Sequence, residues 1–314
     1  MDKVALVGAG LVGRGWAIVF ARAGREVALF DADARALEAA GPAIEASLAD
    51  LGALGLVDED PAAVGARIRP AGTLAEALRG AAYVQESVAE DVAVKRAVFE
   101  ELDALAEDET VLASSTSGIP ASAFTERLAR RRRCLVAHPL NPPYLIPLVE
   151  LCPAPWTDPA AVERARAVLE RAGQVPVLVR REVEGFIVNR LQGALLHAAF
   201  ALVEEGVAGA EDVDRAVKHG LGLRWSFMGP FETIDLNAPG GIADYVRRYG
   251  PLYLKIAQDQ GPAHPWGERL LARIERERRE LLPESGFEAR KGWRDRRLMA
   301  LSAHKRDARS RIGD

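Results

Sequence analysis

The sequence predicts an α/β fold in which a doubly wound parallel-sheet domain, residues 1–184, precedes an all-α domain, residues 185–314. Short apolar runs of strand length alternate with helical or turn segments through the first part, which is typical of a parallel sheet covered by helices. From Gly185 onward helical patterns dominate. With 314 residues, of which 49% are hydrophobic, the chain is long enough for two domains that each bury a core.

The strands of the first domain are expected where the apolar runs lie. These runs are rich in Val and Leu and show little polar alternation, as strands do when helices cover both faces of a sheet. The expected strands are Val4–Val7, Val27–Phe30, Ala82–Val88, Thr110–Ala113 and Cys134–Ala137. Two further runs, Pro147–Leu151 and Val175–Val179, flank a helical segment at Pro159–Ala172 and would extend the sheet.

A glycine-rich turn follows the first expected strand. Gly8, Gly10 and Gly13 stand between that strand and a helical segment, and Asp31 closes the next strand. In such a turn the first glycine permits a tight reversal, the second lets the backbone approach a pyrophosphate, and the third lets the helix pack closely on the strand. The N-terminus of the helix then faces the anion. We therefore predict a Rossmann-type dinucleotide site. Asp31 can accept ribose hydroxyls and would repel a 2′-phosphate, so it favours NAD over NADP.

The helical domain begins with a segment, 186–200, whose apolar residues cover nearly every face. A helix of this kind is usually buried. It either forms the centre of the all-α domain or is shared with a second copy, and we expect a homodimer formed through this domain. The charged tail, Glu268–Arg311, has the pattern of solvated amphipathic helices.

Charge and cysteine content argue against several classes of protein. The formal net charge is −4, from 41 basic and 45 acidic residues, so the chain has no general attraction to nucleic acid or to an anionic membrane. The basic run Arg130–Arg133 is expected to be a solvated helix end. Cys134 and Cys152 form neither a disulfide framework nor a metal-binding spacing. Since no leader precedes the first strand and no apolar run has the length of a membrane span, we expect a cytoplasmic protein with no membrane partner.

His138 is the strongest catalytic candidate. It lies at the C-terminal end of an expected strand, where open α/β sheets place their ligand sites. Glu150 stands in the next apolar strand, and a buried carboxylate needs a partner. Paired with His138, it would fix the imidazole tautomer and stabilise imidazolium, which suits a general base for the oxidation of an alcohol by NAD. A structural His138 and an edge-strand Glu150 remain the alternative.

Hydroxyl groups end the strand that precedes His138, in the segment Ser114–Ser117. They can hydrogen-bond a substrate oxygen, and they can equally well make a turn or a helix cap. No serine stands in the G-x-S-x-G turn of a hydrolase, and no histidine pair has the spacing of a zinc site. The sequence therefore indicates neither a hydrolase nor a metal site.

Taken together, these segments resemble the 3-hydroxyacyl-CoA dehydrogenase superfamily over nearly the whole chain. The shared segments are Gly8–Gly13, Ser115–Ser117, His138–Pro142, Pro147–Glu150, Gly185–Leu191 and Met228–Glu232. Within the superfamily the resemblance is to the branch of lambda-crystallin and L-gulonate 3-dehydrogenase, through Ser114–Ser117, Val136–Tyr144 and Glu232–Ala238.

The resemblance implies roles for individual residues. It implies a catalytic dyad of His138 and Glu150. It implies that Ser117 and Asn189 contact the substrate in the catalytic site and that Asn141 supports the pocket. Beside the glycines, the residues implied to contact NAD are Leu11, Val12, Asp31, Glu90 and Lys95. By composition alone, Glu90 and Lys95 would be ordinary charges at the start of a helix.

One departure from the family concerns the substrate. The resemblance implies that CoA-using members bind the CoA nucleotide with basic residues after the second strand, but here residues 36–66 contain no Lys or Arg and six acidic residues. Such a segment should repel the phosphates of CoA. We therefore predict NAD-dependent oxidation of the 3-hydroxyl of a small L-3-hydroxy acid, L-gulonate or a similar sugar acid, whose carboxylate would pair with Arg224.

Three alternatives to this function stay open. L-Carnitine is one, because Trp225 could face its trimethylammonium group by cation–π attraction. A 3-hydroxyacyl-CoA substrate is the second. The third is a non-catalytic NAD-binding protein, because one fold can serve several functions.

Overall fold

The computed structural model describes residues 3–259 and 266–313, and the remaining residues of the two expected domains, 1–2, 260–265 and 314, lie outside this described part. The chain divides into two compact units. The sheet unit comprises Met1–Arg190 and Arg294–Ser310, and the helical unit comprises Leu191–Trp293 and Arg311–Asp314. The fold class is the one that the sequence predicts. Residues Arg294–Ser310, near the end of the chain, group with the sheet unit although they follow the helical unit in the sequence.

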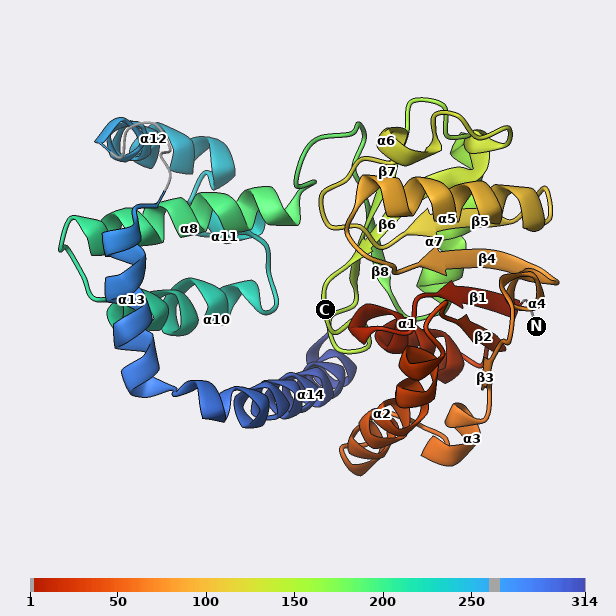
Figure 1. Ribbon diagram of the computed structural model, residues 1–314. Coiled ribbons are helices and arrows are strands. Elements are labelled where there is room, and N and C mark those ends of the chain that lie inside the picture. The colour runs from red at the N-terminus through yellow and green to blue at the C-terminus, as the bar shows by residue number, and fades with distance from the viewer. Residues whose placement is uncertain (1–2, 260–265, 314) are drawn as a thin grey trace. The chain divides into compact units, whose positions relative to one another are not determined.

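The sheet unit contains an eight-stranded sheet in the order β3-β2-β1-β4-β5-β6-β7-β8 (Figure 1). The strands are β1 (Lys3–Val7), β2 (Val27–Phe30), β3 (Ile68–Pro70), β4 (Ala81–Glu86), β5 (Val111–Ser114), β6 (Cys134–Pro139), β7 (Leu148–Pro153) and β8 (Val175–Leu178). The order reverses between β1 and β4, and in open α/β sheets a ligand binds outside the carboxyl ends of the strands at such a switch point. All seven expected strands are present. The edge strand β3 was missed, because its three residues include Arg69 and Pro70 and form no apolar run.

The sheet is parallel, as expected, except at one pair of strands. Strands β6 and β7 are antiparallel, while the other pairs are parallel. Only the short segment 140–147 joins them, and a parallel connection would need a crossover of a dozen or more residues. The consequence is a register in which His138 lies directly opposite Glu150.

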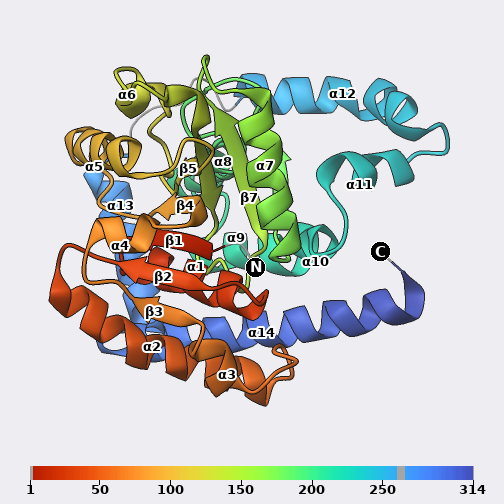
Figure 2. The ribbon, with the colours of Figure 1, turned by 90° about the vertical axis from the view of Figure 1, so that its right-hand side faces the viewer.

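Helices cover both faces of the sheet (Figures 1 and 2). One face packs against α1 (Leu11–Arg22), α2 (Ala34–Ala53), α3 (Pro61–Gly65), α7 (Pro159–Arg171) and α14 (Phe287–Ile312). The other face packs against α4 (Leu74–Leu78), α5 (Val92–Leu105) and α6 (Ser122–Thr125). This arrangement explains why the strand sequences show so little polar alternation.

Two charged segments are less solvated than the sequence suggested. Helix α14 buries Met299 in the core that covers the first face, and its Arg306 donates a hydrogen bond to the carbonyl of Gly55 after α2. In the run Arg130–Arg133, Arg133 is buried and pairs with Asp103 of α5 at 2.9 Å. Both segments look polar by composition because their few buried side chains are outnumbered by exposed charges.

The helical unit contains α8 (Val188–Glu204), α9 (Ala210–Ala216), a π-helical turn (Val217–Leu221), α10 (Gly222–Trp225), α11 (Pro230–Leu236), α12 (Gly241–Asp259) and α13 (Glu268–Leu281), with α8 starting in the sheet unit. In the described part of this unit, the buried residues are Val203, Thr233, Ala238 and Leu270. The expectation of a buried helix at 186–200 is therefore not met within a single chain. In residues 3–259 and 266–313, no helix combines the length and the apolar content that crossing a membrane requires.

Candidate active site

The glycine turn has the geometry that a dinucleotide requires. Gly8 has φ +105°, and a Cβ on it would lie 2.5 Å from the carbonyl oxygen of Ser87, in the loop after β4. A Cβ on Gly13 would lie 1.8 Å from the carbonyl oxygen of Gly8. Gly10 is the N-cap of α1, and a Cβ on it would meet nothing within 4 Å. Gly8 and Gly13 are thus required by packing, while Gly10 borders open space at a helix N-terminus that suits an anion.

Residues around this turn complete a nucleotide-binding edge. Leu11, at the first turn of α1, is 62% exposed despite its apolar side chain, and Val12 beside it is partly buried. Asp31 follows β2, and its two carboxylate oxygens accept hydrogen bonds from the amides of Ala9, at 2.7 Å, and Asp33, at 2.8 Å. The carboxylate is therefore fixed against the glycine turn. The residues present fit a bound NAD.

His138 and Glu150 form a buried pair. The imidazole Nδ1 lies 2.7 Å from Glu150 Oε2, and the two residues are 7% and 0% exposed. Because the carboxylate is an acceptor, we assign the proton to Nδ1, which leaves a lone pair on Nε2. The structure thus brings these two predicted residues together.

The second oxygen of Glu150 holds the start of α8. Its Oε1 accepts hydrogen bonds from the amides of Ile187 and Val188, at 2.7 and 2.9 Å. The preceding Phe186 is fully buried with φ +48°, an uncommon conformation for a bulky residue, and its ring centroid lies 5.8 Å from that of His138. One carboxylate therefore orients the imidazole and fixes the turn that leads into the helix.

Hydrogen bonding decides the ionisation of Glu150. Burial acts to raise the pKa of this carboxyl, but hydrogen bonds from His138 and from the amides of Val188 and Ile187 outweigh it and lower the pKa below its usual range. Since the folded state favours the ionised form, Glu150 stabilises the fold above the ordinary pKa of a glutamate. That contribution is lost as the pH falls through the lower folded-state value.

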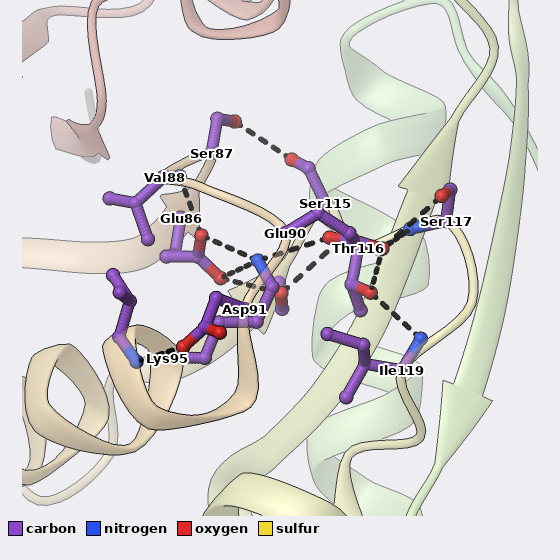
Figure 3. A network of polar contacts seen from close by, with 12 residues as sticks. Glu86, Ser87, Val88, Glu90, Asp91, Lys95, Ser115, Thr116, Ser117 and Ile119 are labelled. Carbon is purple, nitrogen blue, oxygen red and sulfur yellow. Dashed lines mark hydrogen bonds and ion pairs between the residues drawn. The ribbon is translucent and has the colours of Figure 1, made fainter.

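The loop after β5 is organised by Glu90 (Figure 3). Its Oε1 accepts hydrogen bonds from the hydroxyl of Thr116, the amide and hydroxyl of Ser117, and the amide of Gly118, at 2.6, 2.8, 3.2 and 3.3 Å. The carbonyl of Ser117 in turn accepts a hydrogen bond from the Asn189 side chain at 2.8 Å. Partial burial acts to raise the pKa of Glu90, but the bonds from Thr116 and Ser117 and the charge of Lys95 lower it. Ser117, Asn189 and Glu90 are thus gathered in one network.

Lys95 lies behind this loop rather than on its surface. Its amine is 3.0 and 3.2 Å from the two carboxylate oxygens of Glu86 and 3.5 Å from Glu90 Oε2 (Figure 3). Lys95 is 1% exposed and Glu86 is fully buried. Of the other two predicted residues, Asn141 is exposed in the segment between β6 and β7, and Arg224 is exposed on α10 of the helical unit.

Sequence reasoning missed two polar residues at the end of β4. Gln85 donates from Nε2 to the Ser115 hydroxyl at 2.7 Å and to the carbonyl of Ala137, directly before His138, at 3.0 Å. Glu86, the next residue, holds Lys95. A signal was available, because both lie within an expected buried strand, and the argument that assigned a partner to Glu150 applies equally to Glu86.

Comparisons with known proteins cover most of the chain. Residues 3–183 match the family model of the 3-hydroxyacyl-CoA dehydrogenase NAD-binding domain, and residues 185–277 match that of the 3-hydroxyacyl-CoA dehydrogenase C-terminal domain. A lambda-crystallin homolog from Bos taurus is 40% identical over 306 residues, covering 95% of this chain and 94% of its own length. An L-carnitine dehydrogenase from Pseudomonas putida is 34% identical over 298 residues, covering 95% of this chain and 92% of its own.

A solved structure extends the similarity to the fold. The crystal structure of 5-formyl-3-hydroxy-2-methylpyridine 4-carboxylic acid 5-dehydrogenase, an NAD⁺-dependent dismutase, superposes with a TM-score of 0.83 at 29% identity. The match covers 96% of this chain and 97% of that one. Nearly the full length of each protein is therefore shared.

We expect Gly10→Ala to weaken NAD binding and Gly13→Ala to destabilise the fold. An added methyl on Gly10 meets no protein atom, so the variant should fold normally yet lose NAD affinity by roughly tenfold or more, about 1.4 kcal/mol. The same methyl on Gly13 would clash with the Gly8 carbonyl and should destabilise the fold by about 1–3 kcal/mol. Calorimetric titration with NAD and chemical denaturation measure the two effects. Unchanged NAD affinity in a folded Gly10→Ala protein would show that the dinucleotide does not approach this turn.

Proposed function

Because the chain belongs to the 3-hydroxyacyl-CoA dehydrogenase family of NAD-dependent oxidoreductases, we propose that it oxidises the 3-hydroxyl of a small L-3-hydroxy acid, L-gulonate or a similar sugar acid. The observation that carries the proposal is the buried hydrogen bond between His138 and Glu150, in the same compact unit as the glycine turn. A buried ionisable pair is costly to maintain, and an alcohol dehydrogenase needs such a base.

In the proposed mechanism His138 is the general base. Its Nε2 accepts the proton of the substrate hydroxyl, while Glu150 accepts the hydrogen bond from Nδ1 and stabilises the imidazolium that forms. Bound NAD supplies the hydride acceptor. The amides of Ile187 and Val188 keep Glu150 ionised and in place, so that its negative charge stabilises the positive charge of the imidazolium. The fixed geometry spares reorganisation when the charge develops.

The remaining site residues are proposed to bind the two ligands. On the substrate side, the hydroxyl of Ser117 and the amide of Asn189 contact the hydroxy acid, Asn141 supports the pocket, and Arg224 pairs with the carboxylate. On the cofactor side, the proposed contacts are Gly8, Gly10, Leu11, Val12, Gly13, Asp31, Glu90 and Lys95. Asp31 accounts for a preference for NAD over NADP.

A free acid is favoured over a CoA ester by the charge of α2 and the loop after it. This segment carries Glu45, Asp50 and Asp58. Two cations beside it are already paired, since Arg67 contacts Glu59 and Arg306 lies 3.8 Å from Asp58. Phosphate groups would find no unshared basic side chain in 36–66. A second candidate is L-carnitine, supported by the L-carnitine dehydrogenases among the relatives and by Trp225, which is 41% exposed and could face a trimethylammonium group.

The substrate can be identified by NADH formation with L-gulonate, L-carnitine and 3-hydroxybutyryl-CoA. We expect the highest kcat/KM with L-gulonate or a related sugar acid. Preference for carnitine would support the second candidate, and Trp225→Ala should then abolish that preference. Rapid oxidation of 3-hydroxybutyryl-CoA with a strong dependence on salt would overturn the free-acid proposal, because it would require a phosphate-binding surface.

His138→Ala should reduce turnover by roughly 10²–10⁴-fold, the usual contribution of an acid–base group, without weakening the binding of NAD. His304→Ala is a matched control, because His304 is exposed on α14 and should leave the rate unchanged. Steady-state kinetics and NAD titration separate the two effects. A His138→Ala protein that turns over at the normal rate would refute the general-base role.

We further propose that the protein is a cytoplasmic homodimer formed through the helical unit. The described part of this unit buries too few side chains to supply a core of its own, while Leu223, Phe227, Phe231 and Leu236 are 65%, 68%, 75% and 68% exposed. Exposed apolar surface on this scale favours association, and a second copy is its commonest partner. Two free buried cysteines, Cys134 and Cys152, accord with a reducing compartment.

Sedimentation equilibrium at micromolar concentration should give twice the mass of one chain. Phe231→Asp should weaken the association, because it introduces a charge into an apolar surface, whereas Leu105→Asp on α5 of the sheet unit, 50% exposed, should not. A monomeric wild-type protein would contradict the dimer.

A further inference from the structure

We propose that Lys95 is a positioning residue: anchored by the buried carboxylate of Glu86, its ammonium fixes Glu90, and Glu90 holds the Ser117 loop and, through it, Asn189. This role is additional to any cofactor contact. It rests on the proposed function in one respect, namely that Ser117 and Asn189 bind the substrate.

The anchor is a fully buried ion pair at the carboxyl end of β4. Both oxygens of Glu86 lie within 3.2 Å of the Lys95 amine, and one of them also accepts a hydrogen bond from the amide of Val88 at 2.6 Å (Figure 3). The other oxygen accepts a hydrogen bond from the hydroxyl of Ser114 at 2.5 Å. Glu86 is therefore saturated and immobile. Lys95 is 1% exposed and cannot withdraw into solvent.

The Lys95 ammonium also faces the carboxylate of Glu90, toward which its third N–H can point. An ammonium group carries three N–H donors, and Glu90 Oε2 lies 3.5 Å away on the side of the loop. Two carboxylates thus share one cation, and only Glu90 of the pair is partly exposed. The Lys95 ammonium therefore fixes the position of the Glu90 carboxylate, because the Glu86 carboxylate is already held in place.

Glu90 transmits that position to the substrate side. Its other oxygen accepts four hydrogen bonds from Thr116, Ser117 and Gly118, so a rotation of the carboxylate would disturb all of them. Ser117 then contacts Asn189 through its carbonyl at 2.8 Å. Ser114 provides a parallel route, since its hydroxyl donates to Glu86 and accepts a 3.3 Å bond from the amide of Thr116.

The test compares Lys95→Met, the double variant Glu86→Gln/Lys95→Met, and a control. Lys95→Met leaves Glu86 without its counter-charge, so it should lose stability as well as activity. The double variant removes both buried charges, and its glutamine keeps an acceptor for the amide of Val88 and offers an N–H to the hydroxyl of Ser114, so its melting temperature should recover toward the wild-type value. The control is Asp103→Asn, which weakens another buried ion pair of the same helix, with Arg133.

We expect kcat/KM for the 3-hydroxy acid to fall roughly 10- to 100-fold in both Lys95 variants, as misplacement of substrate-binding groups does. Because Lys95 is also proposed to contact NAD, kcat/KM is measured at saturating NAD, so that a weaker affinity for the cofactor does not enter the comparison. Asp103→Asn should lose stability and keep its kcat/KM. Recovery of activity together with stability in the double variant would overturn the proposal, because it would reduce the pair to a structural role. Recovery of the wild-type kcat/KM at saturating NAD would also overturn it, because Lys95 would then act only through the cofactor.

Hydrogen–deuterium exchange supplies a readout that needs no substrate. The amides of Ser117 and Gly118 donate to Glu90 and should exchange faster in both Lys95 variants, but not in Asp103→Asn. Unchanged exchange would refute the positioning role. A wild-type protein that oxidises no 3-hydroxy acid would defeat the proposed function alone, since the exchange of these two amides still decides the role of Lys95.

Discussion

The carboxylate of Glu150 is the interaction on which the arrangement of the site depends. One oxygen orients His138 and the other receives the amides of Ile187 and Val188, so the imidazole and the entrance to α8 share a single anchor. A buried carboxylate is tolerated only when its lone pairs are satisfied, and these three donors satisfy it. The cost of burying the charge is offset by hydrogen bonds that also orient His138, the proposed general base.

The same principle operates at the end of β4. Glu86 and Glu90 are held by Lys95 and by the hydroxyls and amides of the loop after β5. On the other face of the strand, Gln85 connects Ser115 to the carbonyl that precedes His138. Polar side chains at neighbouring strand ends therefore fix both loops of the site. A loop fixed in this way binds a ligand with little loss of conformational entropy.

The helical unit contrasts with this rigidity. Its described residues expose many large apolar side chains and bury few, which is the observation behind the proposed dimer. The sheet unit, by contrast, has two continuous cores and recruits α14 from the end of the chain to complete one of them. The family model of the C-terminal domain ends at residue 277, so α14 lies outside the matched region.

The sequence by itself determined the α/β class, seven of the eight strands, the glycine turn and the pairing of His138 with Glu150. These follow from local apolar patterns and from the cost of burying a charge, both of which can be read within a short stretch of chain. Only the tertiary structure decided that β6 and β7 are antiparallel, that Glu86 shares Lys95 with Glu90, that Glu90 reaches Ser117, and that Met299 closes the core. Each of these depends on which distant segments pack together, and a single sequence carries no periodic signal for such contacts.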